Sequence, residues 1–353
     1  SNVKITEFNL RIELLEVHDM PLGRFLDLLA DMTSVPITLD PAALELAGIS
    51  ATTAITAVFQ NTTDVAGLLR NVLNEKPLDY IPGGQNLQIA LKDYQRLRTV
   101  SYDGKDLADG NSAESVAELI TKLVAPKTWQ ANGGQGVILS EGTKLQINQL
   151  QAVHHEILIF CERLRQARGL PLRSRYPSDR LRLEPPDIAT SLGRSATFTF
   201  LPWTRLREVV NYWQNTSGVT ILVDWAALAR EELVPTSLIS CSAIEQRWED
   251  VFDNVLEPLD LTWWIVDDST IQITSRDALN RMERVEFYAV PASLLARFIS
   301  SDALIESLDS ELQQDGSVAT TTFAIDQVSH RLIVRTTPSS HRYLMQRLNF
   351  QAE

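Results

Sequence analysis

The chain contains an internal repeat, and this repeat constrains its fold more than any other feature. The pattern that runs from Leu22 to Asp40 returns between Leu206 and Asp224, at an offset of 184 residues. A nearly constant offset over most of a chain is the signature of a duplicated unit. Four further matches keep offsets between 183 and 187: Asn71-Val72-Leu73 with Asn254-Val255-Leu256, Leu87-Gln88-Ile89 with Ile271-Gln272-Ile273, Arg98 and Tyr102 with Arg284 and Tyr288, and His154 with His341.

The repeat divides the chain into two kinds of module, which we call X and Y, each present twice. A chain of 353 residues is too long for a single compact core, so several domains are expected. The segment between the copies is rich in proline and arginine and lacks apolar periodicity, as connectors do. The predicted order is X at 8–95, Y at 96–168, a linker at 169–195, X′ at 196–277 and Y′ at 283–350.

Module X is predicted to alternate strands and helices. Leu22, Phe25, Leu26 and Leu29 form the apolar stripe of a helix that follows a strand at 11–17. The remaining elements are strands at 35–39 and 55–59, a helix at 65–73, and a hairpin of 78–81 with 87–91 around Gly83-Gly84.

Module X′ repeats this order, with its hairpin turn at Asp267-Asp268. Ser242 and Glu245 have the spacing of a capping box, which predicts the start of its second helix there.

Module Y is predicted to run strand, helix, strand, strand, helix. Its strands lie at 99–102, 137–139 and 145–147, and its two helices carry apolar stripes that begin at Val116 and Val153. Module Y′ follows the same course. The fold class predicted for the chain is therefore α+β: a tandem duplication of small mixed-sheet modules, X-Y-linker-X′-Y′, with no barrel.

Module X resembles the secretin and TonB short N-terminal domain (STN). The resemblance rests on Met20-Pro21-Leu22-x-x-Phe25-Leu26-x-x-Leu29, on Val35-x-Ile37-x-Leu39-Asp40, and on Leu68-Leu69-x-x-Val72-Leu73 with the closing Leu87-Gln88-Ile89. Module Y is similar to the βαββα ring-building domains that follow it in secretins, through Leu119-Ile120-x-x-Leu123-Val124 and Leu145-x-Ile147.

This resemblance implies a periplasmic, or otherwise extracytoplasmic, bacterial protein that contacts a protein partner in the cell envelope. It implies a non-catalytic interaction or assembly module, which could also form a homo-oligomer. Two departures put a channel in doubt, because the chain has no secretin barrel and its X-Y pair occurs twice. The alternative is a ligand-binding or catalytic protein whose site lies between modules.

Charge and hydropathy narrow the choice of partner. The net charge is −13 and the pI is about 4.9, which disfavours nucleic acid and anionic membrane surfaces. No stretch approaches the roughly 18 apolar residues of a membrane span, so direct membrane insertion is not expected.

The histidines do not form a recognisable catalytic or metal motif. His154-His155-Glu156 lacks the His-Glu-x-x-His spacing of a zinc site. Because His154 recurs as His341 near the start of the same helix, we predict a shared packing or hydrogen-bonding role. No enzyme activity, cofactor or metal is predicted.

Two other polar motifs are also interpreted as structural. The glycine-rich segment 133–136 lies between a helix and a strand with few basic neighbours, which favours a flexible loop over a nucleic-acid clamp. An acidic run lacks the spacing of a calcium loop and is expected to be a solvated helix face. The run comprises Asp302, Glu306, Asp309, Glu311 and Asp315.

Cysteine and tryptophan positions can be compared across the repeat. Cys161 and Cys241 align with apolar residues and are expected to be small core residues, as are Trp213, Trp248 and Trp263. Trp203 and Trp225 instead align with Asp19 and Pro41. They are the candidate partner contacts, because exposed aromatic side chains are common in interfaces; burial of Trp203 against the linker is the alternative.

Overall fold

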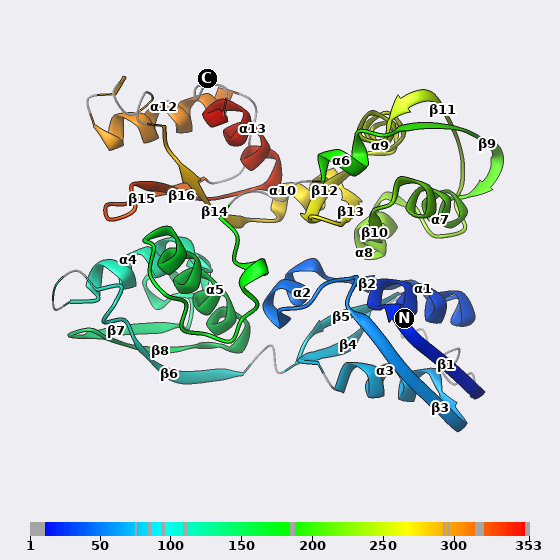
Figure 1. The fold of residues 1–353 in the computed structure, drawn as a ribbon, viewed down its shortest axis with the longest axis horizontal. Coiled ribbons are helices and arrows are strands. Elements are labelled where there is room, and N and C mark those ends of the chain that lie inside the picture. The colour runs from blue at the N-terminus through cyan, green and yellow to red at the C-terminus, as the bar shows by residue number, and fades with distance from the viewer. Residues whose placement is uncertain are drawn as a thin grey trace. The chain divides into compact units, whose positions relative to one another are not determined.

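The structure is a computed structural model of the chain. It describes residues 11–349 except for 75, 84–85, 93–95, 109, 111, 184–187, 292–293, 295–296, 299 and 315–320. The described elements form a mixed α+β fold of small sheets with two or three strands each, as the sequence predicts (Figure 1).

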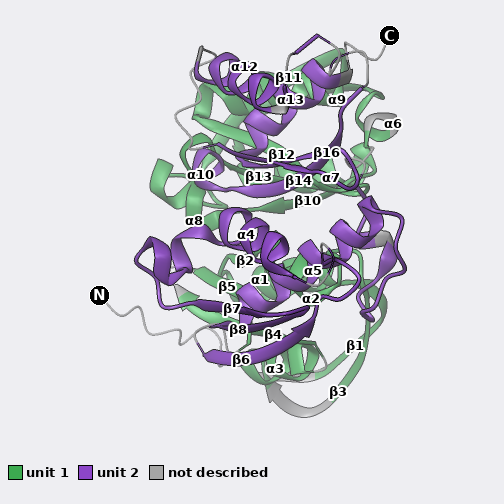
Figure 2. Ribbon diagram, turned by 90° about the vertical axis from the view of Figure 1, so that its left-hand side faces the viewer, with its two compact units in different colours: residues 1–92, 186–278 green, residues 93–185, 279–353 purple. Residues whose placement is uncertain are grey.

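The chain forms two compact units, and each is built from two segments that are distant in the sequence. One unit contains residues 1–92 with 186–278, and the other contains residues 93–185 with 279–353 (Figure 2). The first unit therefore holds X and X′, and the second holds Y and Y′. The boundaries of the four modules stay a prediction.

Module X contains a two-stranded ribbon and a three-stranded sheet. In the ribbon, β1 pairs with β3 in antiparallel fashion; in the sheet, β5 lies between β2, to which it is parallel, and β4, to which it is antiparallel. The elements are β1 (Arg11–Pro21), α1 (Leu22–Thr33), β2 (Ile37–Leu39), α2 (Pro41–Ala47), β3 (Ala54–Asp64), α3 (Val65–Asn74), β4 (Leu78–Gly83) and β5 (Asn86–Leu91).

Module X′ repeats the same pairings. β9 pairs with β11 to form a ribbon, and β13 lies between β10 and β12. Its elements are β9 (Ser195–Arg205), α7 (Leu206–Ser217), β10 (Thr220–Val223), α8 (Trp225–Leu228), β11 (Leu238–Arg247), α9 (Trp248–Leu256), β12 (Leu261–Asp267), β13 (Thr270–Ser275) and α10 (Arg276–Arg281).

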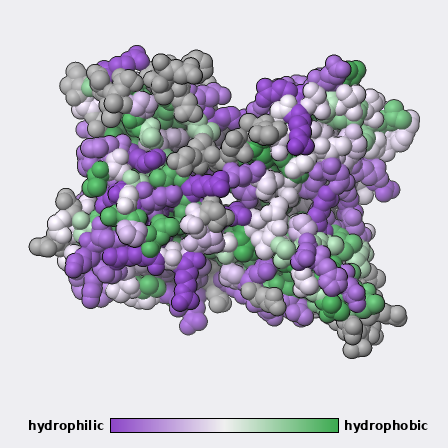
Figure 3. All heavy atoms as spheres, viewed as in Figure 1, coloured by the Kyte–Doolittle hydropathy of each residue, from purple (hydrophilic) through white to green (hydrophobic). Residues whose placement is uncertain are grey.

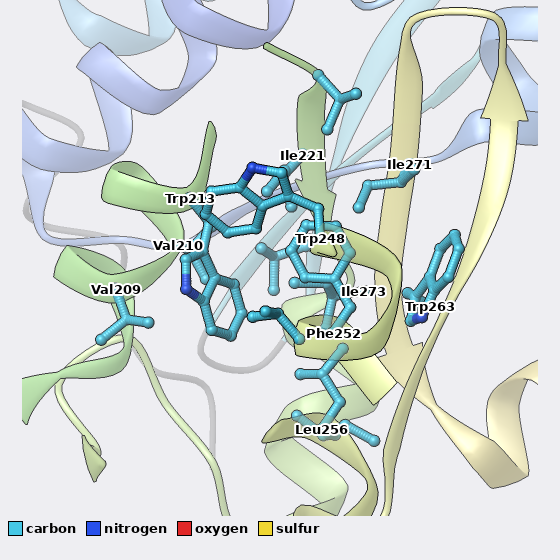
Figure 4. Packing of buried hydrophobic residues seen from close by; sticks show 14 of the residues in the cluster. Val209, Val210, Trp213, Ile221, Trp248, Phe252, Leu256, Trp263, Ile271 and Ile273 are labelled. Carbon is cyan, nitrogen blue, oxygen red and sulfur yellow. The ribbon is translucent and has the colours of Figure 1, made fainter. Parts of the chain in front are cut away.

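The core of X′ is rich in aromatic side chains. Trp213, Trp248, Phe252 and Trp263 come from α7, α9 and β12, and each is at most 2% exposed (Figure 4). Neighbouring rings meet at tilted or edge-on angles, with the Trp213 and Phe252 centroids 5.5 Å apart. This geometry is favourable for aromatic pairs. The prediction that the three tryptophans are core residues is confirmed.

X and X′ pack through α1 and α7 in an arrangement close to two-fold symmetry. Arg207 forms an ion pair with Asp31 at 2.5 Å, and Arg24 donates a hydrogen bond to Asn215. Asn215 is the repeat equivalent of Asp31, and Glu208, beside Arg207, is the equivalent of Arg24. Exchange of the repeats maps one contact onto the other to within one residue, and the cavity between the helices is lined by equivalent positions such as Leu26 and Val210, as in an isologous dimer interface.

Modules Y and Y′ each contain a three-stranded antiparallel sheet covered by two helices. The strand orders are β6-β8-β7 and β14-β16-β15. The elements of Y are β6 (Leu97–Asp103), α4 (Glu114–Leu123), β7 (Val137–Glu141), β8 (Lys144–Leu150) and α5 (Gln151–Ala167). Those of Y′ are β14 (Arg284–Ala289), α12 (Ser301–Gln314), β15 (Thr322–Asp326), β16 (Arg331–Thr336) and α13 (Pro338–Asn349).

Y and Y′ pack in a head-to-tail manner, because the helices of Y cover the sheet of Y′. Phe287, Ala324 and Ile333 from that sheet belong to the same buried cluster as the apolar side chains of α4 and α5. The Phe287 ring lies 5.7 Å from the ring of Phe160 on α5. Two different surfaces meet here, so the interface is heterologous.

One buried and one partly buried ion pair connect Y to Y′ near the end of α5. The guanidinium of Arg168 bonds both carboxylate oxygens of Asp326, at 2.5 and 3.1 Å, and both side chains are at most 8% exposed. Arg163 donates to Glu286 at 2.5 Å and to the backbone oxygen of Val285. Burial would raise the pKa of Glu286, but the positive charges of Arg163 and Arg284 outweigh it and lower that pKa to about 2.

The segment predicted as a linker also contributes buried apolar side chains to the cores of the modules. Leu183 packs into the core of the second unit, and Ile188 and Leu192 pack into the core of X′. Its boundaries at 169 and 195 stay a prediction. Apolar residues spaced this irregularly give no periodic signal, which is why the sequence pattern missed their burial.

Three local predictions are wrong or incomplete. Ser242 and Glu245 lie within β11, and α9 begins at Trp248 after Arg247, which makes no side-chain cap. The glycine-rich segment is not a free loop, because Gly134 and Gly136 donate to the backbone oxygens of Trp129 and Thr128. Helices α2 and α8 were not predicted, although Asp40 and Asp224 each accept a capping hydrogen bond there.

Candidate functional site

The β9–β11 ribbon presents exposed apolar side chains on one face. Trp203 is 70% exposed, Leu238 60% and Leu201 49%. Arg205 lies directly opposite Leu238 across the ribbon, and Leu201 and Trp203 lie just before it, within the register shift between Phe200 and Thr204. Figure 3 shows apolar residues at the right-hand edge, where Figure 1 places β9 and β11. We call Leu201, Trp203, Arg205 and Leu238 the X′ patch.

The local sequence explains why these side chains point outward. Successive residues of a strand face opposite sides. Phe198, Ile239 and Ala243 are buried against the core of X′, so the positions that alternate with them face solvent. Between Phe200 and Thr204 the register shifts, and the three residues 201–203 are all exposed. The ribbon has only two strands among the described residues, and nothing there covers its outer face.

Trp225, the second candidate contact, lies in a different environment. It is the first residue of α8, after Asp224, whose carboxylate accepts from the Ala227 backbone and from the Thr274 hydroxyl. Trp225 is partly buried against the X′ core and lines a small cavity, whereas Trp203 belongs to neither. Both residues stay predicted partner contacts, and only Trp203 has the exposure expected of one.

The cavity beside Trp225 lies between α1 and α7, within the first unit. Its volume is about 40 Å³, which suits one or two water molecules and is far below the few hundred Å³ of a small-molecule pocket. Burial raises the pKa of Asp27 in its wall to about 6, although a hydrogen bond from Gln214 opposes the shift. The cavity can hold solvent and a shifted carboxyl group, but it does not form a substrate site.

The two repeated histidines form the same structural arrangement. In Y, His154 Nδ1 accepts from the Tyr102 hydroxyl at 2.8 Å, and Nε2 donates to the Arg98 backbone oxygen at 2.8 Å. In Y′, His341 does the same with Tyr288 and Arg284, at 2.7 and 3.0 Å. The predicted hydrogen-bonding role is confirmed. Burial lowers the pKa of both imidazoles, so each is held in its neutral form.

Other groups that could carry chemistry are occupied or isolated. Cys161 is buried, Cys241 is partly buried, and both are free thiols. Glu311 of the acidic run accepts from Arg347 at 2.8 Å, while Asp302 and Glu306 are exposed. Asp315 lies outside the described residues. In the described part of the chain, no three His, Cys, Asp or Glu side chains are arranged to hold a metal ion.

Sequence comparison identified Trp203 but missed the other members of the X′ patch. Leu201 and Leu238 are ordinary strand residues, and their exposure follows from the register of the ribbon. Exposed apolar residues also occur on the β1–β3 ribbon, where Leu14 is 59% and Val58 50% exposed. The period of two in Thr197-Phe198-Thr199-Phe200-Leu201 was the signal that could have separated the two faces.

Comparisons with known proteins give weak similarities. No family model matches the chain, and neither does any curated protein. Among solved structures, the chain is similar to the N-terminal domain of the secretin XcpQ from Pseudomonas aeruginosa, with 9% identity over 98% of this chain and 100% of that one, at a TM-score of 0.18. A structure described as XcpQN012 gives 10% identity over 97% of this chain and 98% of that one, at 0.19.

A third similarity is to the GspC-GspD complex from the type II secretion system of enterotoxigenic Escherichia coli. Identity is 16% over 44% of this chain and 97% of that chain, with a TM-score of 0.17. At these TM-scores the likenesses carry no argument about function.

No helix in the described ranges is long and apolar enough to cross a membrane.

Proposed function

We propose that the chain is a non-catalytic interaction or assembly module of the bacterial cell envelope, which binds a protein partner through the X′ patch. The observation that carries this proposal is the 70% exposure of Trp203 on an uncovered ribbon face. Large aromatic side chains at such positions are the usual anchors of protein interfaces.

The surroundings of Trp203 support an interface. Leu201 and Leu238 extend the apolar surface, and Arg205 adds a charge at its border. An apolar centre with polar residues around it is the usual anatomy of a protein interface. Among the residues that the structure describes, no third strand pairs with the ribbon, and strand edges of this kind can accept a partner strand.

The periplasmic location rests on the resemblance of modules X and Y to secretin domains and on their alternation along the chain. The alternative of a ligand-binding or catalytic protein has less support. The cavity within the first unit is small, and the buried histidines are used in packing. The non-enzymatic proposal therefore accounts for more of the described residues.

The test is site-specific photo-crosslinking in the native bacterium. A photoreactive phenylalanine analogue replaces Trp203 in one variant and Leu238 in another. The control carries it at Val328, which is 62% exposed in the second unit. We expect one discrete adduct in the periplasmic fraction from the first two variants and none from the control. Equal adducts from all three positions, or none from any, would contradict the proposed contact.

A stability measurement separates an interface role of Trp203 from a core role. Trp203→Ala should leave the thermal melting temperature nearly unchanged, because surface substitutions usually change stability by less than about 0.5 kcal/mol. The matched core variant is Trp213→Ala, at a fully buried position. It should cost about 3–5 kcal/mol. A similar loss of stability in both variants would mean that Trp203 supports the fold.

A further inference from the structure

The β1–β3 ribbon of X presents a patch with the same layout as the X′ patch but with the opposite charge. Glu16 lies directly opposite Val58 across that ribbon, and Leu14 lies two residues before Glu16 on the same face. Leu14, Glu16 and Val58 are all exposed. We call these three residues the X patch. In both patches, an apolar residue precedes a charged one by two positions, and a second apolar residue lies across from the charge.

The net charges of the two ribbons differ in the same way as Glu16 and Arg205: the X ribbon is negative and the X′ ribbon is positive. Strands β1 and β3 contain one arginine and four carboxylates, a net charge of −3. Strands β9 and β11 contain two arginines and one glutamate, a net charge of +1. A positive ribbon is unexpected in a chain whose net charge is −13. Charge complementarity of this kind selects partners and orients their encounter.

Both charged groups are available for an external partner. Glu16 and Arg205 are exposed, and neither forms an ion pair with another described residue. By contrast, Arg207 and Arg247, their basic neighbours in X′, are already paired with Asp31 and Glu249.

We propose that the partner of the X′ patch is a second copy of this chain, whose X patch docks on it with Glu16 against Arg205. This inference rests on the function proposed above and adds the identity of the partner. Trp203 and Leu238 would cover Leu14 and Val58 of the other copy, so five apolar side chains, with Leu201, would leave water together. The contact joins two different surfaces, and it therefore has a direction and can repeat from copy to copy.

The test is a charge exchange followed by sedimentation velocity over a range of protein concentrations. Wild-type protein should self-associate reversibly. Arg205→Glu and Glu16→Arg, each alone, should weaken association about tenfold or more, because each places like charges together. The double variant Glu16→Arg with Arg205→Glu should restore the wild-type affinity. Arg230→Glu is the control: Arg230 is exposed in the same unit, belongs to neither patch and gives the same change in net charge.

Melting temperatures of all variants check that the fold is kept, and the two single variants test opposite patches independently. A wild-type chain that stays monomeric at every concentration would overturn the proposal, as would association insensitive to both reversals. The crosslinks from Trp203 keep the two proposals distinct. An adduct of twice the mass of the chain supports self-association, whereas an adduct with a different protein supports the proposed function and overturns the second copy.

Discussion

The X–X′ and Y–Y′ pairs each join two modules with matching strand orders, but they pack by different rules. X and X′ meet through equivalent surfaces of α1 and α7, with a partly exposed ion pair between Arg207 and Asp31. Y and Y′ meet through unlike surfaces, with Phe287 and the Arg168–Asp326 pair buried. The comparison shows that a matching strand order does not fix how two modules associate, because the residues on each surface decide which faces are buried.

Sequence divergence on one sheet face explains the Y–Y′ arrangement. In Y′, Ile333 pairs with Phe287 and Ala324, and these three form the apolar face that α4 and α5 cover. The register equivalents in Y are Gln146, Ser101 and Leu139, so that face is largely polar. Burying this face stabilises the protein in Y′ but not in Y. The helices of Y therefore cover the sheet of Y′, and the reverse packing does not form.

The largest effect is expected from Phe287→Ala. This change removes a ring that is 2% exposed and packs on Phe160 at the Y–Y′ interface. It should cost about 3–5 kcal/mol of unfolding free energy in urea denaturation. The matched control is Ser101→Ala, at the equivalent exposed position of Y, which should stay within about 0.5 kcal/mol. Equal effects at the two positions would remove the distinction between the two sheet faces.

A second large effect is expected from Arg168→Ala, which leaves Asp326 buried without its partner. Burial would raise the pKa of Asp326, but hydrogen bonds from Arg168 and Ser329 outweigh it and keep that pKa below its usual range. Removing one member of a buried pair typically costs about 3 kcal/mol or more. The double variant Arg168→Leu with Asp326→Leu should recover part of this loss, because no unpaired charge remains. A loss below about 1 kcal/mol for Arg168→Ala would show that water reaches the carboxylate.

A smaller effect is expected at the X–X′ contact. Asp31→Ala removes the ion pair with Arg207. The side chain of Arg207 is 29% exposed and that of Asp31 is 50% exposed. Pairs as exposed as this contribute about 0–1 kcal/mol and are screened by salt. The difference in melting temperature between Asp31→Ala and wild type should therefore shrink as sodium chloride is added. For Arg168→Ala, salt should have little effect, and this contrast separates the two interfaces.

The smallest effect is expected for Asp27, in the cavity between α1 and α7. Its pKa is raised in the folded protein, so the protonated form is favoured there. The protonated Asp27 carboxyl therefore adds to the free energy of unfolding. This addition is fully present below the usual pKa of 3.8 and is lost as the pH rises through about 6. Asp27→Asn should therefore melt at a higher temperature than wild type at neutral pH. Atoms of the cavity wall desolvate the carboxyl group, but Asp27 as a whole residue is exposed, so water screens the effect and the gain should be small.

The pH dependence of the Asp27→Asn difference is the decisive measurement. The gain in melting temperature should decrease as the pH falls from about 6 toward 4, where wild-type Asp27 becomes protonated. Gln214→Ala serves as a comparison, because it removes a hydrogen bond at the same carboxyl without removing the titrating group. A pH-independent difference for Asp27→Asn would rule out the carboxyl group as its cause.

The sequence by itself determined the order and kind of the elements. The apolar stripe from Leu22 to Leu29 and its repeat from Leu206 predicted α1 and α7, because a helix buries every third or fourth residue whatever it packs against. The recurrence of His154 as His341 predicted a shared hydrogen-bonding role, since both copies keep the tyrosine that completes it. These signals are local, and a period or a spacing is enough to read them.

Only the tertiary structure decided which copies meet and which faces remain exposed. The consecutive order X-Y-X′-Y′ gives no hint that X would pack with X′ across the 93 residues that separate their segments. The exposure of Leu238 likewise depends on its pairing with Arg205, and the burial of Leu183 on a core formed by other segments. Such outcomes depend on the total apolar area that the folded chain can bury, which is a property of many residues together and not of any one segment.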